Sequence, residues 1–435
     1  MIFASTRTPS DRVTFAEGIF RGLAPDGGLY HPVEHPDLTN LIRDMHQTTS
    51  FADLAGALVF ALLRDELSHR DAERIARRAF PFSPAIVPLG PGLQLLELFH
   101  GPSCAFKDFG ASFLAACMEH FLGTRDRRAV ILTATSGDTG SAVAQAFHGA
   151  HNIEVVILYP SGRVSPLQEK QLTTVGGNVH AVEVHGSFDD CQRMVKEAFV
   201  DQRLTAELSL TSANSINLGR LLPQAFYYVY GAVQTAPAQP VFCVPSGNFG
   251  NLTAGVLAWK WGMAAHRFLA TTNANDVVPH YLATGAFTPR PSVPTLSNAM
   301  DVGNPSNFER LAALFDHDVT RMRAQIEGAS ITDADTTAAI ARYHREQNMF
   351  LCPHTATGVL AAERYRDRHT DASTDHPILC LATAHPGKFL EVVEDATGTR
   401  PPLPAQLAEA LARPKVAVPM ANRLEELREF LLDSF

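Results

Sequence analysis

A lysine stands among apolar neighbours in the stretch GPSCAFKDFGASFLAACM, residues 101–118. Lys107 lies between Phe106 and Phe109 and precedes a run of small and apolar residues that is typical of a buried helix. Burying an ammonium group is costly unless a partner compensates it or it loses its proton. A deprotonated lysine is a nucleophile and a base. The alternative is a lysine at the start of a helix whose charged end reaches solvent, and Lys107 alone does not decide between the two.

A first polar loop, TSGDTG, follows the apolar run at 129–135 and precedes the helical run at 141–150. The N–H groups at such a helix start, with the hydroxyls of Thr135, Ser136 and Thr139, could hold a carboxylate or a phosphate. The same residue types are good helix caps. Taken alone, this loop fits anion binding and simple capping equally well.

A second loop repeats that plan after the apolar run at 240–245. Its glycines let an anion approach bare backbone, and its residues are Ser246, Gly247, Asn248, Phe249, Gly250 and Asn251. It contains neither the lysine of a Walker loop nor the GxGxxG pattern of dinucleotide-binding proteins. The loop therefore favours a terminal phosphate monoester over ATP or a dinucleotide.

A third loop, ATAHPGKF, ends the apolar run at 378–384 and offers Thr383, His385 and Lys388. His385 is a candidate base, although a lone histidine at the end of a strand is commonly structural. A buried lysine, a phosphate loop and a hydroxyl at a strand end together meet the needs of pyridoxal phosphate. That cofactor requires an amine, N–H donors for its phosphate and a partner for its ring nitrogen.

Short apolar runs that alternate with helix-length segments must position these loops. We expect strands at 129–135, 154–160, 179–184, 240–245, 267–273 and 378–384. This alternation predicts the α/β class, with parallel sheets covered by helices, and ligands bind beyond the carboxyl ends of such strands.

At 435 residues the chain is too long for one simple core. We expect an N-terminal, mostly helical domain at 1–90, a catalytic region at 91–395 and a C-terminal helical tail at 396–435. Within the catalytic region, 126–204 should form the smaller α/β subdomain and the remainder the larger one. The proline-rich stretch FPFSPAIVPLGPG, residues 80–92, is interpreted as a connection between domains.

The composition restricts the class of partner. The formal net charge is −9 and no dense basic stripe is present, which argues against nucleic acid and anionic membranes. Six scattered cysteines without a CxxC pair indicate reduced core thiols. No secretion signal and no apolar run near the roughly 20 residues of a membrane span are found, so we expect the cytoplasm. His31 and His35 lack metal-site spacing, and no metal site is expected.

Several longer motifs occur in order and resemble threonine synthases of the longer bacterial and fungal type. They include GLAPDGGLY, FHGPSCAFKDFGA, TATSGDTGSAVA, TSANSINLGRLLPQ, PSGNFGNLTAG, NAMDVGNPSNFERL, CPHTATG and ATAHPGKF. The resemblance extends from the first residues to about residue 395. It implies the tryptophan-synthase-like fold (fold type II), pyridoxal 5'-phosphate as cofactor, and conversion of O-phospho-L-homoserine and water into L-threonine and phosphate.

The resemblance also implies roles for individual residues. Lys107 should bind the cofactor covalently, Ser246 to Asn251 should hold its phosphate, and Thr383 should face its ring nitrogen. Thr135, Ser136, Asp138 and Thr139 should meet the substrate carboxylate and the phenolic oxygen of the cofactor, with Asp138 at the cofactor. Asn214, Ser215 and Arg220 should bind the substrate phosphate.

Two other functions remain open at this point. One is another enzyme of the same fold, such as a threonine or serine dehydratase or a sulfide-using synthase, but these do not require a separate phosphate site. The other is a non-catalytic homologue that binds a ligand, although Lys107 and all three loops are retained. The sequence does not determine whether the protein is a monomer or a homodimer.

Overall fold

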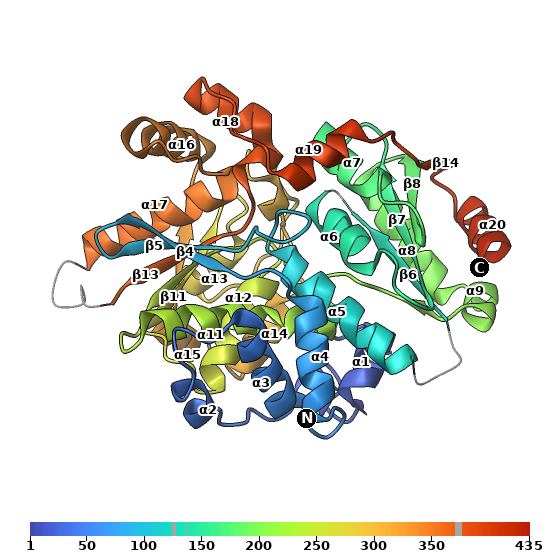
Figure 1. Cartoon of the computed structure of the whole chain (residues 1–435), viewed down its shortest axis with the longest axis horizontal. Helices are drawn as coiled ribbons and strands as arrows, with labels where there is room; N and C mark the ends of the chain where they lie inside the picture. The colour runs from blue at the N-terminus through green and yellow to red at the C-terminus, as the bar shows by residue number, and fades with distance from the viewer. Residues whose placement is uncertain (124–127, 136, 370–375) are drawn as a thin grey trace.

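Three β-sheets organise the chain, and the computed structural model describes them over residues 1–123, 128–135, 137–369 and 376–435 (Figure 1). One sheet belongs to the N-terminal part, a six-stranded sheet forms the larger α/β unit, and a five-stranded sheet forms the smaller one. The two larger sheets are built mainly of parallel strands, which confirms the predicted α/β class.

The N-terminal part combines a small antiparallel sheet with four helices. The sheet has the order β2-β1-β3. The first helix begins with a reciprocal cap, because Thr14 accepts from the N–H of Glu17 while Glu17 accepts from the N–H of Thr14. The elements are β1 (Phe3–Ser5), β2 (Arg12–Val13), α1 (Phe15–Arg21), β3 (Tyr30–Pro32), α2 (Thr39–Arg43), α3 (Phe51–Leu63) and α4 (His69–Ala79).

The six-stranded sheet has the order β12-β11-β10-β13-β5-β4, and only β4 runs antiparallel to its neighbour. Along β10, Phe242 and Val244 face one apolar cluster while Val241 and Cys243 face another. Both faces are therefore buried, as expected for parallel strands under helices. The strands are β4 (Ala85–Gly90), β5 (Leu93–Glu97), β10 (Val241–Pro245), β11 (Arg267–Thr272), β12 (Ile326–Ser330) and β13 (Ile378–Ala382).

Helices cover both faces of this sheet. The Cys243 face packs against α16 (Asp333–Gln347) and α17 (Pro353–Arg368), and the Phe242 face packs against α11 (Gln224–Thr235) and α12 (Gly250–Lys260). The remaining helices of this part are α13 (Val277–Thr284), η1 (Asn298–Met300), α14 (Phe308–Leu314), α15 (Val319–Gln325), η3 (Pro386–Phe389) and α18 (Leu390–Thr397).

The five-stranded sheet is parallel throughout, with the order β14-β8-β7-β6-β9. Its strands are β6 (Ala129–Ala134), β7 (Ile153–Pro160), β8 (Val179–His185), β9 (Leu210–Thr211) and β14 (Val418–Ala421). The helices around it are α5 (Lys107–Leu122), α6 (Asp138–Phe147), α7 (Pro166–Thr173), α8 (Phe188–Val200), α9 (Gln202–Glu207), α19 (Ala405–Ala412) and α20 (Leu424–Ser434). The short helix α10 (Leu218–Leu221) packs against α1, α5, α11 and α12.

Helix α5, which begins at Lys107, is anchored by aromatic packing. Phe109 meets Phe51 of α3 edge to face at 5.2 Å, and Phe113 meets Phe226 of α11 in the same way at 5.8 Å. Both phenylalanines of α5 are fully buried. Edge-to-face pairs of this kind add stability beyond the area they bury, so the start of α5 has a fixed position between the N-terminal part and both sheets.

Two expectations about local structure were wrong. The stretch at 80–92 is not only a connection, because it contains strand β4. Pro88 is tolerated there since β4 lies at the edge of its sheet. The segment 396–435 is not wholly helical either: β14 adds a parallel strand to the edge of the five-stranded sheet, next to β8. The division of the chain into three domains with the expected boundaries stays a prediction.

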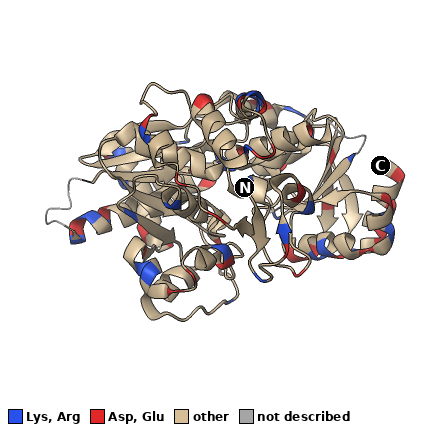
Figure 2. Ribbon diagram, turned by 90° about the horizontal axis from the view of Figure 1, so that it is seen from below, with Lys and Arg blue, Asp and Glu red and all other residues tan. Residues whose placement is uncertain are grey.

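The cysteines and the distribution of charge can be compared with the expectations drawn from the composition. All six cysteines are free and buried, which confirms the expectation of core thiols. Basic and acidic residues are interspersed along the ribbon in Figure 2. Across the described ranges, we find no helix with the length and apolar character required to span a membrane.

Candidate active site

Lys107 occupies the first position of α5, and its side chain is only 18% exposed. Its Nζ lies 3.8 Å from Asp138 Oδ2 and 5.5 Å from the centre of the Phe106 ring. Burial lowers the pKa of Lys107, Asp138 opposes this effect, and the charges of Lys388 and Arg220 add to it. The amine is therefore enclosed and biased toward its neutral, nucleophilic form.

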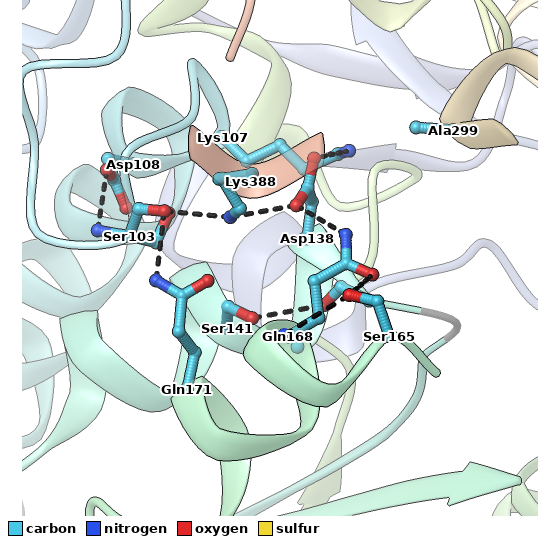
Figure 3. A network of polar contacts seen from close by, with 12 residues as sticks. Ser103, Lys107, Asp108, Asp138, Ser141, Ser165, Gln168, Gln171, Ala299 and Lys388 are labelled. Carbon is cyan, nitrogen blue, oxygen red and sulfur yellow. Dashed lines mark hydrogen bonds and ion pairs between the residues drawn. The ribbon is translucent and has the colours of Figure 1, made fainter. Parts of the chain in front are cut away.

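Asp138, the first residue of α6, lies at the centre of a buried polar network (Figure 3). Its Oδ1 pairs with Lys388 Nζ at 2.8 Å and accepts from Gln168 Nε2 at 2.9 Å, while Oδ2 faces Lys107. Burial alone would raise the pKa of Asp138, but Lys388 and Lys107 together hold it well below its ordinary value. The carboxylate is thus ionised, with Lys388 as its nearer partner and the Lys107 amine as its more distant one.

The turn before α5 is tied to this network. The Ser103 carbonyl accepts from Lys388 Nζ at 2.8 Å and from Gln171 Nε2 at 3.1 Å. The Ser103 N–H donates to Asp108 Oδ2 at 3.0 Å. Burial raises the pKa of the Asp108 carboxyl to about 6. These bonds fix the backbone from which Lys107 projects.

The loop at 246–251 is compact and contains one left-handed residue. Phe249 has φ 61° and immediately precedes α12. A Cβ on Gly247 would lie 2.7 Å from Met300 Cα, so only glycine fits at this position. The Ser246 hydroxyl donates to the Asn251 side chain, whose Nδ2 donates to the Pro245 carbonyl at 2.8 Å. These contacts fix the start of α12, where the Leu252 N–H donates to Asn251 Oδ1 at 3.0 Å. The N–H groups at the start of a helix, which lie ahead of its first intrahelical backbone bonds, are the ones suited to a phosphate.

Asn248 links this loop to the segment expected to bind the substrate phosphate. Its Nδ2 donates to Ser215 Oγ at 2.8 Å, and its Oδ1 accepts from the N–H of Ser306 at 2.6 Å. The neighbouring Asn214 Oδ1 accepts from Thr133 Oγ1 at 3.5 Å. The structure thus brings together the two loops for which the sequence predicted separate phosphates.

Arg220 is buried and only partly hydrogen-bonded. Its Nη1 donates to the Ala213 carbonyl at 2.6 Å, but its Nε has no hydrogen-bond partner among the described residues. Burial lowers the pKa of Arg220 to about 10, although Asp108 opposes this. A buried cation with an unused donor is costly, and an anion bound here would compensate it.

The TSGDTG loop divides into residues with different environments. Thr135 Oγ1 accepts from the N–H groups of Gly137 and Gly140 at 3.0 and 2.9 Å, so this hydroxyl already holds the first turn of α6. Thr139 is half-buried. Ser136 lies outside the described residues. Thr135 therefore caps the helix, as one of the two interpretations of this loop expected. The Asp138 carboxylate instead faces Lys107 and Lys388.

Residues 383–385 pack against the turn before Lys107. The Thr383 carbonyl accepts from the N–H of Phe106 at 2.8 Å, which joins the end of β13 to the residue before Lys107. His385 Nδ1 accepts from the N–H of Gly387 at 3.0 Å and its ring meets Phe99 edge to face at 5.3 Å. Burial lowers the pKa of His385 to about 4, and its contacts are those of a structural residue.

Sequence reasoning did not assign three residues of this site. Lys388 belongs to the third loop and His354 to the motif CPHTATG, but neither was given a role, and Gln168 was not singled out at all. His354 is buried, accepts from the N–H of Ala299 at 3.2 Å and has no described partner at Nδ1. Polar residues within the motifs SPLQEK, CPHTATG and HPGKF were the available signal.

Comparisons with known proteins cover the whole chain. Family models described as "Threonine synthase N terminus", "Pyridoxal-phosphate dependent enzyme" and "Threonine synthase, C-terminal" match residues 2–80, 92–383 and 355–431. The threonine synthase of Haemophilus influenzae is 42% identical over an alignment of 434 residues that covers 98% of this chain and 98% of that protein. The chain belongs to the threonine synthase family.

The solved structures agree with this assignment. A pyridoxal-phosphate-bound threonine synthase from Brucella melitensis has a TM-score of 0.92 and 36% identity, covering 99% of this chain and 98% of that one. A threonine deaminase from Solanum lycopersicum has a TM-score of 0.55 and 15% identity, over 76% and 93% of the two chains, and shares the fold alone. The expected family, fold type and cofactor are thereby confirmed.

The described residues fit pyridoxal phosphate. The enclosed amine of Lys107 can bind its aldehyde carbon, and the close approach of Met300 to Gly247 shapes a loop that leaves N–H groups for its phosphate. Among the described residues, Arg220 Nε has no hydrogen-bond partner. A second anion site beside Arg220 stays a prediction.

Proposed function

We propose that the protein converts O-phospho-L-homoserine and water into L-threonine and phosphate at the site around Lys107. The observation that carries the proposal is the arrangement of two anion-binding features around one enclosed amine. The start of α12 offers backbone donors, and Arg220 offers a guanidinium N–H that no residue in the described part of the chain accepts. A cofactor phosphate and a substrate phosphate would each have a partner.

We assign the cofactor to the residues that follow the strands of the larger sheet. Lys107 would attach it, Ser246 to Asn251 would hold its phosphate, and Thr383 would face its ring nitrogen. When bound, the cofactor supplies a sink for the negative charge that develops on the carbon next to the substrate amine.

Lys107 is the proposed base. Its burial favours the unprotonated amine, which can accept a proton at Nζ from the carbon next to the substrate amino group. The closed surroundings, with 18% of the side chain exposed, exclude most water from that nitrogen. Asp138 is near enough to stabilise the ammonium that results.

Arg220, Asn214 and Ser215 are the proposed residues for the substrate phosphate. The negative charge on that phosphate grows as its bond to carbon breaks, so a cation here contributes most as it leaves. Asp138, Ser136 and Thr139 are proposed for the end of the substrate that carries the amine and the carboxylate. Thr135 would support that loop through its bonds to Gly137 and Gly140.

The reaction can be tested by supplying O-phospho-L-homoserine to the protein loaded with pyridoxal phosphate. Threonine should accumulate, whereas free L-threonine and L-serine should give little 2-oxo acid. Rapid 2-oxobutanoate formation from threonine, with no turnover of the phosphorylated substrate, would identify a dehydratase instead.

We also place the protein in the cytoplasm, because its cysteines are buried and unpaired.

A further inference from the structure

Asp138 has two lysine neighbours, and the nearer one is not the lysine that the proposed reaction uses. Lys388 Nζ lies 2.8 Å from Asp138 Oδ1, whereas Lys107 Nζ lies 3.8 Å from Oδ2. The Lys388 side chain has no exposed surface. Because an ion pair strengthens at short distance and away from water, Lys388 is the stronger partner of the carboxylate.

We propose that Lys388 is a positioning residue that keeps the Lys107 amine unprotonated by holding the Asp138 carboxylate as its own ion-pair partner. The inference rests on the proposed role of Lys107 as the reactive amine. It adds a function for a buried lysine that the proposed reaction otherwise leaves unused.

The geometry orients the carboxylate toward Lys388. Gln168 Nε2 donates to the same oxygen, Asp138 Oδ1, that Lys388 pairs with. Lys388 is fixed in turn by its bond to the Ser103 carbonyl at 2.8 Å and by its place in the short helix η3. Both donors meet Oδ1, so Lys107 is left with the longer contact to Oδ2 (Figure 3).

Charges other than that of Lys388 also affect the protonation of Lys107. Arg220 of α10 disfavours its protonation, and among the described residues Asp138 of α6 is the group that favours it. His354 of α17 is neutral at pH 7, because burial lowers its pKa to about 4. Asp108, the next residue of α5, bonds to the Ser103 N–H. The balance of charge at Lys107 therefore depends on how far Lys388 neutralises Asp138.

Removing Lys388 would leave Lys107 as the nearest cation to a buried carboxylate. A nearby opposite charge shifts a pKa by about 1–3, so the pKa of Lys107 would rise. Each pKa step of one lowers the neutral fraction of the amine near pH 7 about tenfold. The cofactor would then attach to Lys107 more slowly.

The test measures the protonation of individual lysines in the full-length chain freed of cofactor. Trace acetylation with acetic anhydride at a series of pH values, read by mass spectrometry, gives the pH of half-maximal labelling for each lysine. Lys388→Met removes the charge at similar length, and Lys388→Arg retains it. Lys196→Met, at an exposed position of α8, is the matched control.

We expect Lys107 in the unaltered chain to reach half-maximal labelling at a pH below the ordinary lysine value of 10.5. In Lys388→Met, half-labelling of Lys107 should move up by about one pH unit or more, with attachment of added pyridoxal phosphate slowed about tenfold at pH 7. Lys388→Arg and Lys196→Met should leave Lys107 near its original value.

Two results would overturn the proposal: unchanged labelling of Lys107 in Lys388→Met, or half-maximal labelling of Lys107 at or above pH 10.5 in the unaltered chain. The second result requires no variant, so it decides even if Lys388→Met does not fold. Labelling is independent of turnover. If the lysines behave as expected but no threonine is made, the proposed function fails while this inference stands.

Discussion

Arg220 packs directly against Gly110, one turn after Lys107 in α5. A Cβ on residue 110 would lie 2.8 Å from both the Nε and the carbonyl oxygen of Arg220. Glycine at this position therefore lets a buried guanidinium come close to the reactive lysine. The contact connects the cation proposed for the substrate phosphate to the helix that carries the proposed base.

Arg220→Ala should lower kcat/KM for O-phospho-L-homoserine about ten- to a few-hundred-fold, because a hydrogen bond to a charged group contributes roughly 1.5–3 kcal/mol. Part of the loss should fall on kcat, since phosphate charge grows on departure. Cofactor affinity should change little, and inhibition by phosphate should weaken.

Gly110→Ala should also lower kcat/KM for O-phospho-L-homoserine, because its added methyl group would displace Arg220. Gly56→Ala is its control, because the added Cβ in α3 would meet its nearest atom at 3.4 Å. Loss of cofactor with normal substrate binding would mean that the two phosphate sites are assigned the wrong way round.

Lys107→Ala should bind pyridoxal phosphate weakly through the loop at 247–251 and form no threonine. In the unaltered protein, borohydride reduction should fix the cofactor to the peptide that contains Lys107, which mass spectrometry can locate. The physical reason is that Lys107 is the enclosed amine that the network of Asp138 and Lys388 surrounds. Near-normal turnover of the variant would place the base elsewhere.

The sequence located the loops at 135–140, 246–251 and 383–388 because they follow apolar runs. Lys107 stood out by its apolar neighbours, and Asn214, Ser215 and Arg220 were assigned only through the family resemblance. Each of the six expected strands is present, since a run of buried residues between helices has few other interpretations. The short strands β1 to β3 and β9 and the edge strands β12 and β14 carry much less signal. Strand β4 could not be recognised because it contains Pro88, and proline is found in few strands other than edge strands.

Lys388 shows why part of the site could not be predicted. Its position in the 3₁₀ turn η3 does not reveal that its side chain turns inward to Ser103 and Asp138. That direction depends on the packing of β13 against the turn before α5. The hydrogen bonding of Arg220 is likewise a tertiary property, because its Nη1 reaches the Ala213 carbonyl only after the chain has folded.

Thr383→Asp should change the absorption spectrum of the bound cofactor and increase side reaction to 2-oxobutanoate. A carboxylate favours a protonated ring nitrogen, whereas a hydroxyl does not require one. Absorbance and product analysis measure the two effects, with Thr383→Ser as the conservative control. An unchanged spectrum together with an unchanged product ratio would show that Thr383 is not the partner of the ring.

Asp108→Asn should stabilise the protein at alkaline pH. Burial raises the pKa of Asp108 from 3.8 to about 6, so the folded chain holds this proton more tightly than the unfolded chain. That stability is fully present below about pH 4 and is lost as the pH rises through about 6, a difference of roughly 3 kcal/mol. Urea unfolding should show a gain for the variant at pH 8 and little change at pH 4.5. An equal effect at both pH values would contradict the ionisation argument.

The fate of the water oxygen tests the central claim most directly. The protein, loaded with pyridoxal phosphate, is incubated with O-phospho-L-homoserine in ¹⁸O-labelled water, and both products are examined by mass spectrometry. Breaking the carbon–oxygen bond and adding water to the neighbouring carbon should place one ¹⁸O in the hydroxyl of threonine and none in the phosphate at the moment of release. Labelled phosphate with unlabelled homoserine would show simple phosphate-ester hydrolysis, and would contradict the account.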